Sequence, residues 1–185
     1  MMTEISLNIL DIAQNSVSAH ANLIEISVEI NQKIELLTIT INDNGCGMTA
    51  EQAKNAQDPF YTTRTTRKVG LGIPFFKQAA LSCGGSFNLE SAPGNGTKIE
   101  AAFRLTHIDR MPLGDITSTM YSLVTFNPDI DFLYTYRVDD KSFILDTKEL
   151  RCILQDVPLS DPQVASFIRD YLKENHAEVN GSFYF

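Results

Sequence analysis

Residues 43–48 read Asp43-Asn44-Gly45-Cys46-Gly47-Met48, and this short segment decides how the rest of the chain is interpreted. It is rich in turn-forming residues, and it directly follows a stretch in which Leu37, Ile39 and Ile41 alternate with polar residues. Such alternation is typical of a strand with one buried face. We therefore expect Asp43 to stand at the end of a strand and to open a tight loop.

Regular elements are expected on both sides of this loop. Before it, apolar residues at helical spacing predict a helix over residues 6–19, and alternation predicts a strand over 24–30 paired with the strand that ends near residue 42. The helix carries a polar stripe of Asn8, Asp11, Asn15 and Ser18 on one face. After the loop we expect a helix over 50–56, a polar lid over 58–69, a helix from about Gly70 to Ser82, and strands over 86–90 and 98–105.

The remainder of the chain differs in charge. Residues 1–105 have a net charge of −2 and residues 106–185 a net charge of −6. Pro and Gly in residues 109–114 predict a junction, so we expect a first domain over 1–107 and a small acidic α+β region over 108–185. This region is expected to hold a helix over 115–126, a hairpin of strands 132–138 and 142–146, and a helix opened by Asp161-Pro162.

Composition limits the function classes. The 185 residues are 43% hydrophobic and 21% charged, which is ordinary for a globular protein, and the net charge of −8 argues against a general nucleic-acid-binding surface. No apolar run approaches the ~18 residues of a membrane span, and no basic-then-apolar leader opens the chain. Three cysteines at irregular positions predict neither a metal motif nor a disulfide framework, so a reducing cytoplasm is expected.

Several motifs in a fixed order give the chain its resemblance over about residues 4–105. It resembles the GHKL ATPases, the superfamily of gyrase, Hsp90, histidine kinases and MutL. The matching segments are Asp11-Ile12-Ala13-Gln14-Asn15-Ser16, Asp43-Asn44-Gly45-Cys46-Gly47-Met48, the lid segment Asp58-Pro59-Phe60-Tyr61-Thr62-Thr63-Arg64, Gly70-Leu71-Gly72-Ile73 and Gly94-Asn95-Gly96-Thr97. The resemblance implies a two-layer α/β sandwich of the Bergerat type, with a mostly antiparallel mixed sheet and helices on one face.

The resemblance also implies a site for ATP. Asp43 would accept the exocyclic amine of adenine, whereas the carbonyl of guanine would repel its carboxylate. Gly45 and Gly47 would let the backbone approach the base, because a side chain there would clash. Met48 would help to wall the base, and Thr97 would assist Asp43. These residues are the expected adenine pocket.

Phosphate and metal contacts are expected from the other motifs. The side-chain amide oxygen of Asn15 suits Mg²⁺, a hard cation that keeps waters and shares the nucleotide phosphates. Gly70, Leu71 and Gly72 open a helix, whose unsatisfied amides and dipole favour phosphate. Arg64, in the lid, would neutralise phosphate charge, with a solvated basic loop as the plain alternative.

Asp11 bears on the mechanism. In the gyrase and MutL branch a glutamate stands four residues before the asparagine and activates water as a general base; Asp11 holds that position with a side chain one methylene shorter. Histidine kinases instead transfer the γ-phosphoryl group, which needs mainly positioning and charge neutralisation. This sequence has Ser18 and Lys68 where kinases commonly have a basic residue and a lid glycine.

Three functions therefore remain open. The first is a stand-alone protein kinase or nucleotide-dependent switch acting on a partner protein, similar to anti-sigma-factor kinases. The second is a slow ATPase whose nucleotide state gates dimerisation, and the third is a nucleotide-binding regulator without catalysis. None of His20, His107 and His176 lies in a phosphoacceptor-like setting, and surface or loop positions are expected for all three. A protein partner is expected, and a homodimer is a further option.

Overall fold

The computed structural model describes residues 3–59, 71–155 and 157–181, and within them the strands form one six-stranded sheet of order β3-β4-β2-β1-β5-β6. No helix in this part of the chain is long and apolar enough to cross a membrane. The elements are α1 (Ile5–Ser18), β1 (Leu23–Asn31), β2 (Leu36–Asp43), α2 (Ala50–Asn55), α3 (Gly72–Ser82), β3 (Ser86–Ser91), β4 (Thr97–Arg104), α4 (Ile116–Phe126), β5 (Asp131–Val138), β6 (Lys141–Asp146), α5 (Thr147–Leu154) and α6 (Pro162–Asn180).

The sheet is mixed but mostly antiparallel, as the sequence predicts. The pairs β1–β2, β2–β4, β3–β4 and β5–β6 are antiparallel, and β1 and β5 pair in parallel. Ile24 pairs with Asp43 on one side and with Phe132 on the other, so these three residues lie in one row near the same end of the sheet.

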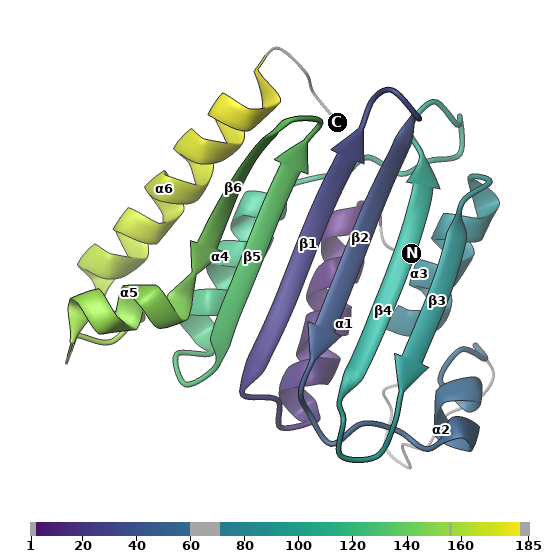
Figure 1. The fold of residues 1–185 in the computed structure, drawn as a ribbon, viewed down its shortest axis with the longest axis horizontal. Coiled ribbons are helices and arrows are strands. Elements are labelled where there is room, and N and C mark those ends of the chain that lie inside the picture. The colour runs from purple at the N-terminus through teal and green to yellow at the C-terminus, as the bar shows by residue number, and fades with distance from the viewer. Residues whose placement is uncertain (1–2, 60–70, 156, 182–185) are drawn as a thin grey trace.

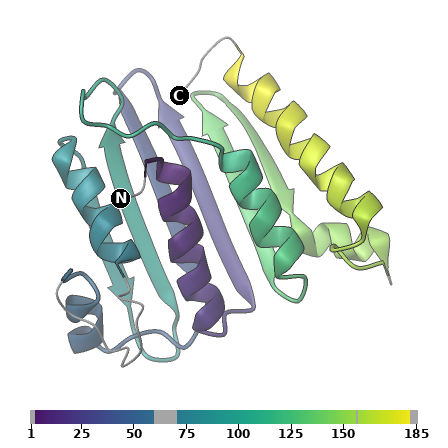
Figure 2. The same cartoon turned by 180° about the vertical axis from the view of Figure 1, so that it is seen from behind.

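Helices cover one face of the sheet. Figure 2 shows α1, α3 and α4 lying across that face, with α6 beside the β6 edge, and Figure 1 shows the opposite face without helices. The alternation read from the sequence explains this: Ile24, Ile26 and Val28 of β1 are buried, while Glu25 and Ser27 between them face the open side. The expected two-layer α/β architecture is confirmed.

The C-terminal region continues the same sheet. Because β5 pairs with β1 along eight residues, from Leu23↔Asp131 to Ile30↔Val138, the expected division at residue 107 does not coincide with a break in the strand pairing. The aromatic residues Phe132, Tyr134, Tyr136 and Phe143 are buried in the common core. At the edge, the Tyr171 hydroxyl of α6 donates to the carbonyl of Ile144 in β6 at 3.1 Å, which satisfies one group of the last strand.

Two sequence expectations for this region were incomplete or wrong. The helix α5 was missed; it begins where the Asp146 side chain accepts hydrogen bonds from the amides of Lys148 and Glu149. The helical spacing of Val164, Phe167, Ile168, Tyr171 and Leu172 predicts an apolar face on α6, but the Phe167 side chain is 55% exposed, whereas Ile168 is fully buried.

The expectation that His176 lies at the surface or in a loop was also wrong. His176 of α6 is 6% exposed, its Nε2 lies 2.9 Å from the Tyr134 hydroxyl, and its ring centroid lies 4.0 Å from that of Tyr136. Tyr136 in turn donates to Asn180 Oδ1 at 2.7 Å. Burial raises the pKa of Tyr136 to about 12 and that of Tyr134 well above its usual value, so both hydroxyls stay protonated. This polar cluster fastens α6 to the sheet.

The burial of His176 predicts a loss of stability in acid. Burial lowers the pKa of His176 from 6.5 to about 4, against a smaller opposing effect of the nearby Asp115 carboxylate. The unfolded chain therefore binds a proton that the folded chain does not bind between these values, so the stabilising contribution is complete above pH 6.5 and is lost as the pH falls towards 4. We expect this residue to contribute about 3 kcal/mol to the pH dependence of the unfolding free energy.

Urea unfolding of the wild type and of His176→Gln at pH 7.5 and 4.5 checks this prediction. Glutamine keeps an acceptor for the Tyr134 hydroxyl but does not titrate, so the variant should lose less stability between the two pH values than the wild type. An equal loss in both proteins would show that another group carries the acid sensitivity.

Candidate functional site

Two glycine-containing loops pack together at one end of the sheet. The loop after β2 and the loop between β3 and β4 are joined by a hydrogen bond from the Gly94 amide to the Cys46 carbonyl at 2.8 Å. Gly47 and Gly96 both have positive φ, and a Cβ atom on Gly47 would overlap the carbonyl of Ala92, as one on Gly96 would overlap that of Asp43. These glycines are therefore needed to bring the loops together, and the close approach of Gly45 and Gly47 to a base, which the resemblance implies, stays a prediction.

The side chain of Asp43 is fixed by three hydrogen bonds in the candidate site. It is 8% exposed, and its carboxylate accepts from the Ser16 hydroxyl at 2.6 Å on Oδ2, from the Gly45 amide at 2.9 Å on Oδ1, and from the Thr97 amide at 3.3 Å on Oδ1. A carboxylate has about four acceptor positions. One position on Oδ2 therefore remains for a further hydrogen-bond donor, such as an amine.

Ser91, a residue that the sequence analysis missed, connects Met48 with Thr97, whose amide donates to Asp43. The Ser91 hydroxyl accepts from the Met48 amide at 2.8 Å and lies 2.9 Å from the Thr97 hydroxyl and 2.8 Å from the Gly96 carbonyl. Thr97 thus contacts Asp43 through its backbone amide, while its side-chain hydroxyl lies within hydrogen-bond distance of Ser91. Ser91 and Thr97 are cross-strand partners in the β3–β4 hairpin, a signal that the hairpin register could have given.

Asp11 and Asn15 lie on the side of α1 that faces α3. A Cβ atom on Gly72 would overlap the Asp11 carboxylate, so the two helices approach closely because this position is glycine. Both polar side chains are half-buried, and neither hydrogen-bonds another side chain of the described residues. The Asn15 oxygen is thus free to ligate a hard cation, and the residues present fit Mg²⁺ shared with a nucleotide.

The first turn of α3 offers amides to an anion. The helix begins at Gly72 with Leu71 at its N-cap, and no side chain caps it. The amides of Gly72 and Ile73 have no partner within the helix, and Pro74 has no amide hydrogen. Of the predicted residues, Gly72 lies against Asp11, Leu71 precedes Gly72, and Asn15 lies one helical turn after Asp11 on α1. Arg64, Gly70 and the lid residue Phe60 lie outside the described residues.

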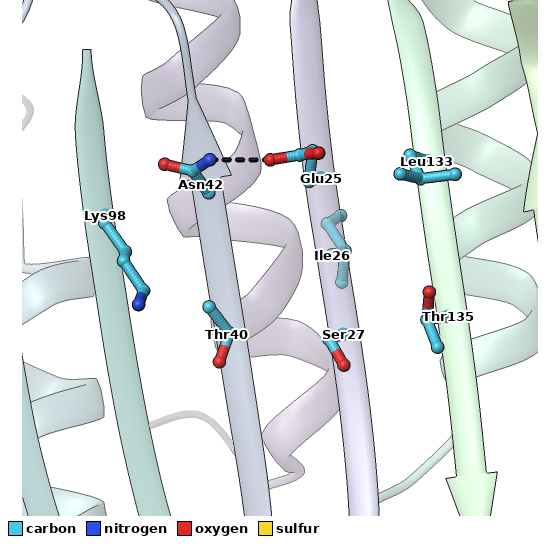
Figure 3. A pocket seen from close by; sticks show the side chains of 8 residues that line it. All are labelled: Glu25, Ile26, Ser27, Thr40, Asn42, Lys98, Leu133 and Thr135. Atoms are coloured by element: carbon cyan, nitrogen blue, oxygen red, sulfur yellow. Dashed lines mark hydrogen bonds between the residues drawn. The ribbon is translucent and has the colours of Figure 1, made fainter. Parts of the chain in front are cut away.

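A shallow hollow on the open face of the sheet does not belong to this site. It is lined by side chains of four adjacent strands, among them Glu25, Thr40, Asn42, Lys98 and Thr135, and Glu25 accepts a hydrogen bond from Asn42 at 2.6 Å (Figure 3). Asp43 is buried on the helix-covered side, so the hollow and the predicted nucleotide residues lie on opposite faces of β2.

Comparison with known proteins agrees with this geometry. Residues 1–107 match the family described as histidine kinase-, DNA gyrase B-, and HSP90-like ATPase, which is more than half of the chain. The chain belongs to this family. Both packed loops, α1 and the first turn of α3 fall within the residues that match the family, and β5, β6 and α4–α6 lie beyond them.

The relatives are sensor proteins, and this chain matches only a part of each. The chain is 30% identical over 107 residues to a sensor protein of Shewanella frigidimarina, covering 57% of this chain and 16% of that one. It is 32% identical over 78 residues to sensor histidine kinase WalK of Bacillus subtilis, covering 40% and 13%. The chain therefore spans less than a fifth of either relative.

Solved structures show the same fold over more of the chain. The ATPase domain of Aquifex aeolicus MutL complexed with ADP is similar with a TM-score of 0.51 and 13% identity, over 92% of this chain and 88% of that one. The N-terminal domain of a DNA repair protein gives a TM-score of 0.55 and 17% identity, over 78% and 53%. At these identities the likeness concerns the fold alone.

Proposed function

We propose that this chain binds ATP with Mg²⁺ between α1, the loop after β2 and the first turn of α3, and acts as a protein kinase or nucleotide-dependent switch on a partner protein. The observation that carries the proposal is the Asp43 carboxylate, which is buried, held by three donors and left with one free acceptor position. An acceptor fixed in this way selects a donor at position 6 of the purine, which adenine has and guanine lacks.

Different groups of the same site would bind the metal ion and the phosphates of the triphosphate. Asn15 would hold Mg²⁺, which neutralises phosphate charge when bound, and the amides at the start of α3 would receive phosphate oxygens. Phosphoryl transfer depends mainly on such positioning and electrostatic stabilisation. The likeness to sensor kinases supports transfer to a protein acceptor, which a second protein would supply.

A slow ATPase is the second candidate, and the position of Asp11 favours it. The Asp11 carboxylate contacts the first turn of α3, where the terminal phosphate would lie, so it can receive a proton from an attacking water. Incubation with γ-labelled ATP and a cell extract separates the candidates. Label on a second protein supports the kinase, free phosphate alone supports the ATPase, and neither product contradicts both.

Substitution of Asp11 gives a sharper test. We expect Asp11→Asn to keep ATP affinity within about twofold and to lower turnover at least about tenfold, which corresponds to ~1.4 kcal/mol in the barrier. Asparagine keeps the size of the side chain beside Gly72 but cannot take up a proton. Phosphate release or label transfer checks turnover, and titration calorimetry checks binding. Equal turnover in variant and wild type would remove Asp11 from the chemistry.

A further inference from the structure

Asn8 of α1 contains an unsatisfied buried atom that the nucleotide contacts do not explain. The residue is completely buried, and its side-chain nitrogen donates to the Glu4 carbonyl at 3.2 Å. Its oxygen Oδ1 is buried and has no hydrogen-bond partner among the residues that the structure describes. An orphaned buried acceptor costs about 1–3 kcal/mol, so a completely buried polar side chain in the first turn of α1 needs an explanation.

The position of Asn8 suggests that reason. At 3.6 residues per turn, Asn8 and Asp11 are neighbours on the side of α1 that faces α3, as the overlap between a Gly72 Cβ and Asp11 indicates. The Ser6 carbonyl, in contrast, accepts from the Thr119 hydroxyl of α4 at 3.4 Å. Helical side chains lean towards the N-terminus, so the Asp11 carboxylate leans over the turn that contains Asn8.

The chemistry of the two groups requires a donor between them. The amide nitrogen of Asn8 is engaged with Glu4, so its oxygen faces the other side of the amide group. This oxygen and an ionised carboxylate are both acceptors and cannot bond each other. A water molecule has two hydrogens and can donate one to each, as buried waters commonly do for polar groups without a protein partner.

We propose that Asn8 is a positioning residue for Asp11, acting through one buried water that donates to Asn8 Oδ1 and to the Asp11 carboxylate. The inference rests on the proposed role of Asp11. The bridge fixes the carboxylate against the first turn of α3, which is the place proposed for the terminal phosphate. Without the bridge, the carboxylate is free to rotate away, and small misplacements of a reacting group lower rates strongly.

Asn8→Leu tests the proposal, because leucine has a similar size and cannot hold the water. We expect turnover of Mg·ATP, measured as kcat for phosphate release, to fall about tenfold, with KM within about twofold. The melting temperature should change little, since leucine fills the space and removes the acceptor together with the water that it binds. A purely structural role predicts the opposite, a lower melting temperature with kcat unchanged.

Two further variants distinguish the expected loss of turnover from a folding defect. Asn8→Ser keeps a hydroxyl and leaves room for water, so it should recover kcat to within about threefold of the wild type. Ser6→Ala removes an equally buried polar group from the side of α1 away from Asp11, and it should leave kcat unchanged. If Ser6→Ala lowers kcat as much as Asn8→Leu does, the proposal is overturned.

A crystal structure of the wild type provides a readout without activity. The proposal is supported by a water that lies within hydrogen-bond distance of both Asn8 Oδ1 and the Asp11 carboxylate and is absent in Asn8→Leu. This support holds even if the wild type turns over no ATP, because that result would contradict only the proposed catalysis. A dry contact, a cation in place of the water, or a direct bond from another side chain to Asn8 Oδ1 would overturn it.

Discussion

Asn15→Ala is expected to abolish magnesium-dependent binding of ATP, with a loss of affinity of at least about 100-fold. The Asn15 amide lies on the side of α1 that faces α3 and makes no side-chain hydrogen bond within the described residues, so its oxygen is available to the cation. Mg²⁺ keeps most of its waters and is held by few protein oxygens. Removing the one that α1 supplies therefore removes the coupling between metal and nucleotide.

Titration calorimetry with ATP in the presence of Mg²⁺ or of EDTA measures this loss. Truncation at Asn15 leaves no buried partner unsatisfied, so the melting temperature should change little. Gln14→Ala is the matched control, because this neighbouring amide is exposed on the same helix. Unchanged Mg²⁺-dependent heat in Asn15→Ala would remove the metal assignment.

Local patterns in the sequence predicted most of the fold. Alternation in residues 24–30 and 37–42 predicted a hairpin with one buried face, and the β1–β2 pairing from Ile24↔Asp43 to Asn31↔Leu36 confirms it. The pairing of β5 with β1 could not be predicted, because a parallel contact between residues about a hundred positions apart leaves no local pattern. The burial of His176 was available in principle, since it follows the buried Leu172 by four residues on α6.

The candidate site, like the fold, could be predicted only in part from the sequence. The motifs placed Asp43 at the end of β2 and Asn15 on α1, but the sequence did not reveal that Ser16 donates to Asp43, a contact between residues 27 positions apart. It also did not reveal that Gly47 must lack a side chain because the neighbouring loop at Ala92 packs against it. Such contacts depend on how whole elements pack, and a motif read along the chain does not contain that information.

Asp43→Asn is expected to reverse the preference between purines at the site. In the wild type, one lone pair of Oδ2 remains for a donor, after Ser16 has taken the other and the amides of Gly45 and Thr97 have taken Oδ1. In the variant, the amide oxygen stays with the two backbone donors and the –NH₂ group takes the place of Oδ2. The group that faces the base is then a hydrogen-bond donor, so it opposes the amine of adenine and can donate to a carbonyl oxygen.

ATP and ITP measure this reversal, because the purine of ITP has a carbonyl where that of ATP has the amine. We expect the affinity for ATP to fall about 100-fold or more, since an unpaired donor would face an unpaired donor in a buried position. The affinity for ITP should be equal or higher than in the wild type. Asp129→Asn, at an exposed aspartate before β5, makes the same change of charge away from the site and should alter neither affinity. Equal losses for both nucleotides would mean that Asp43 supports the loops without reading the base, because only a direct contact with position 6 can weaken one nucleotide and spare the other.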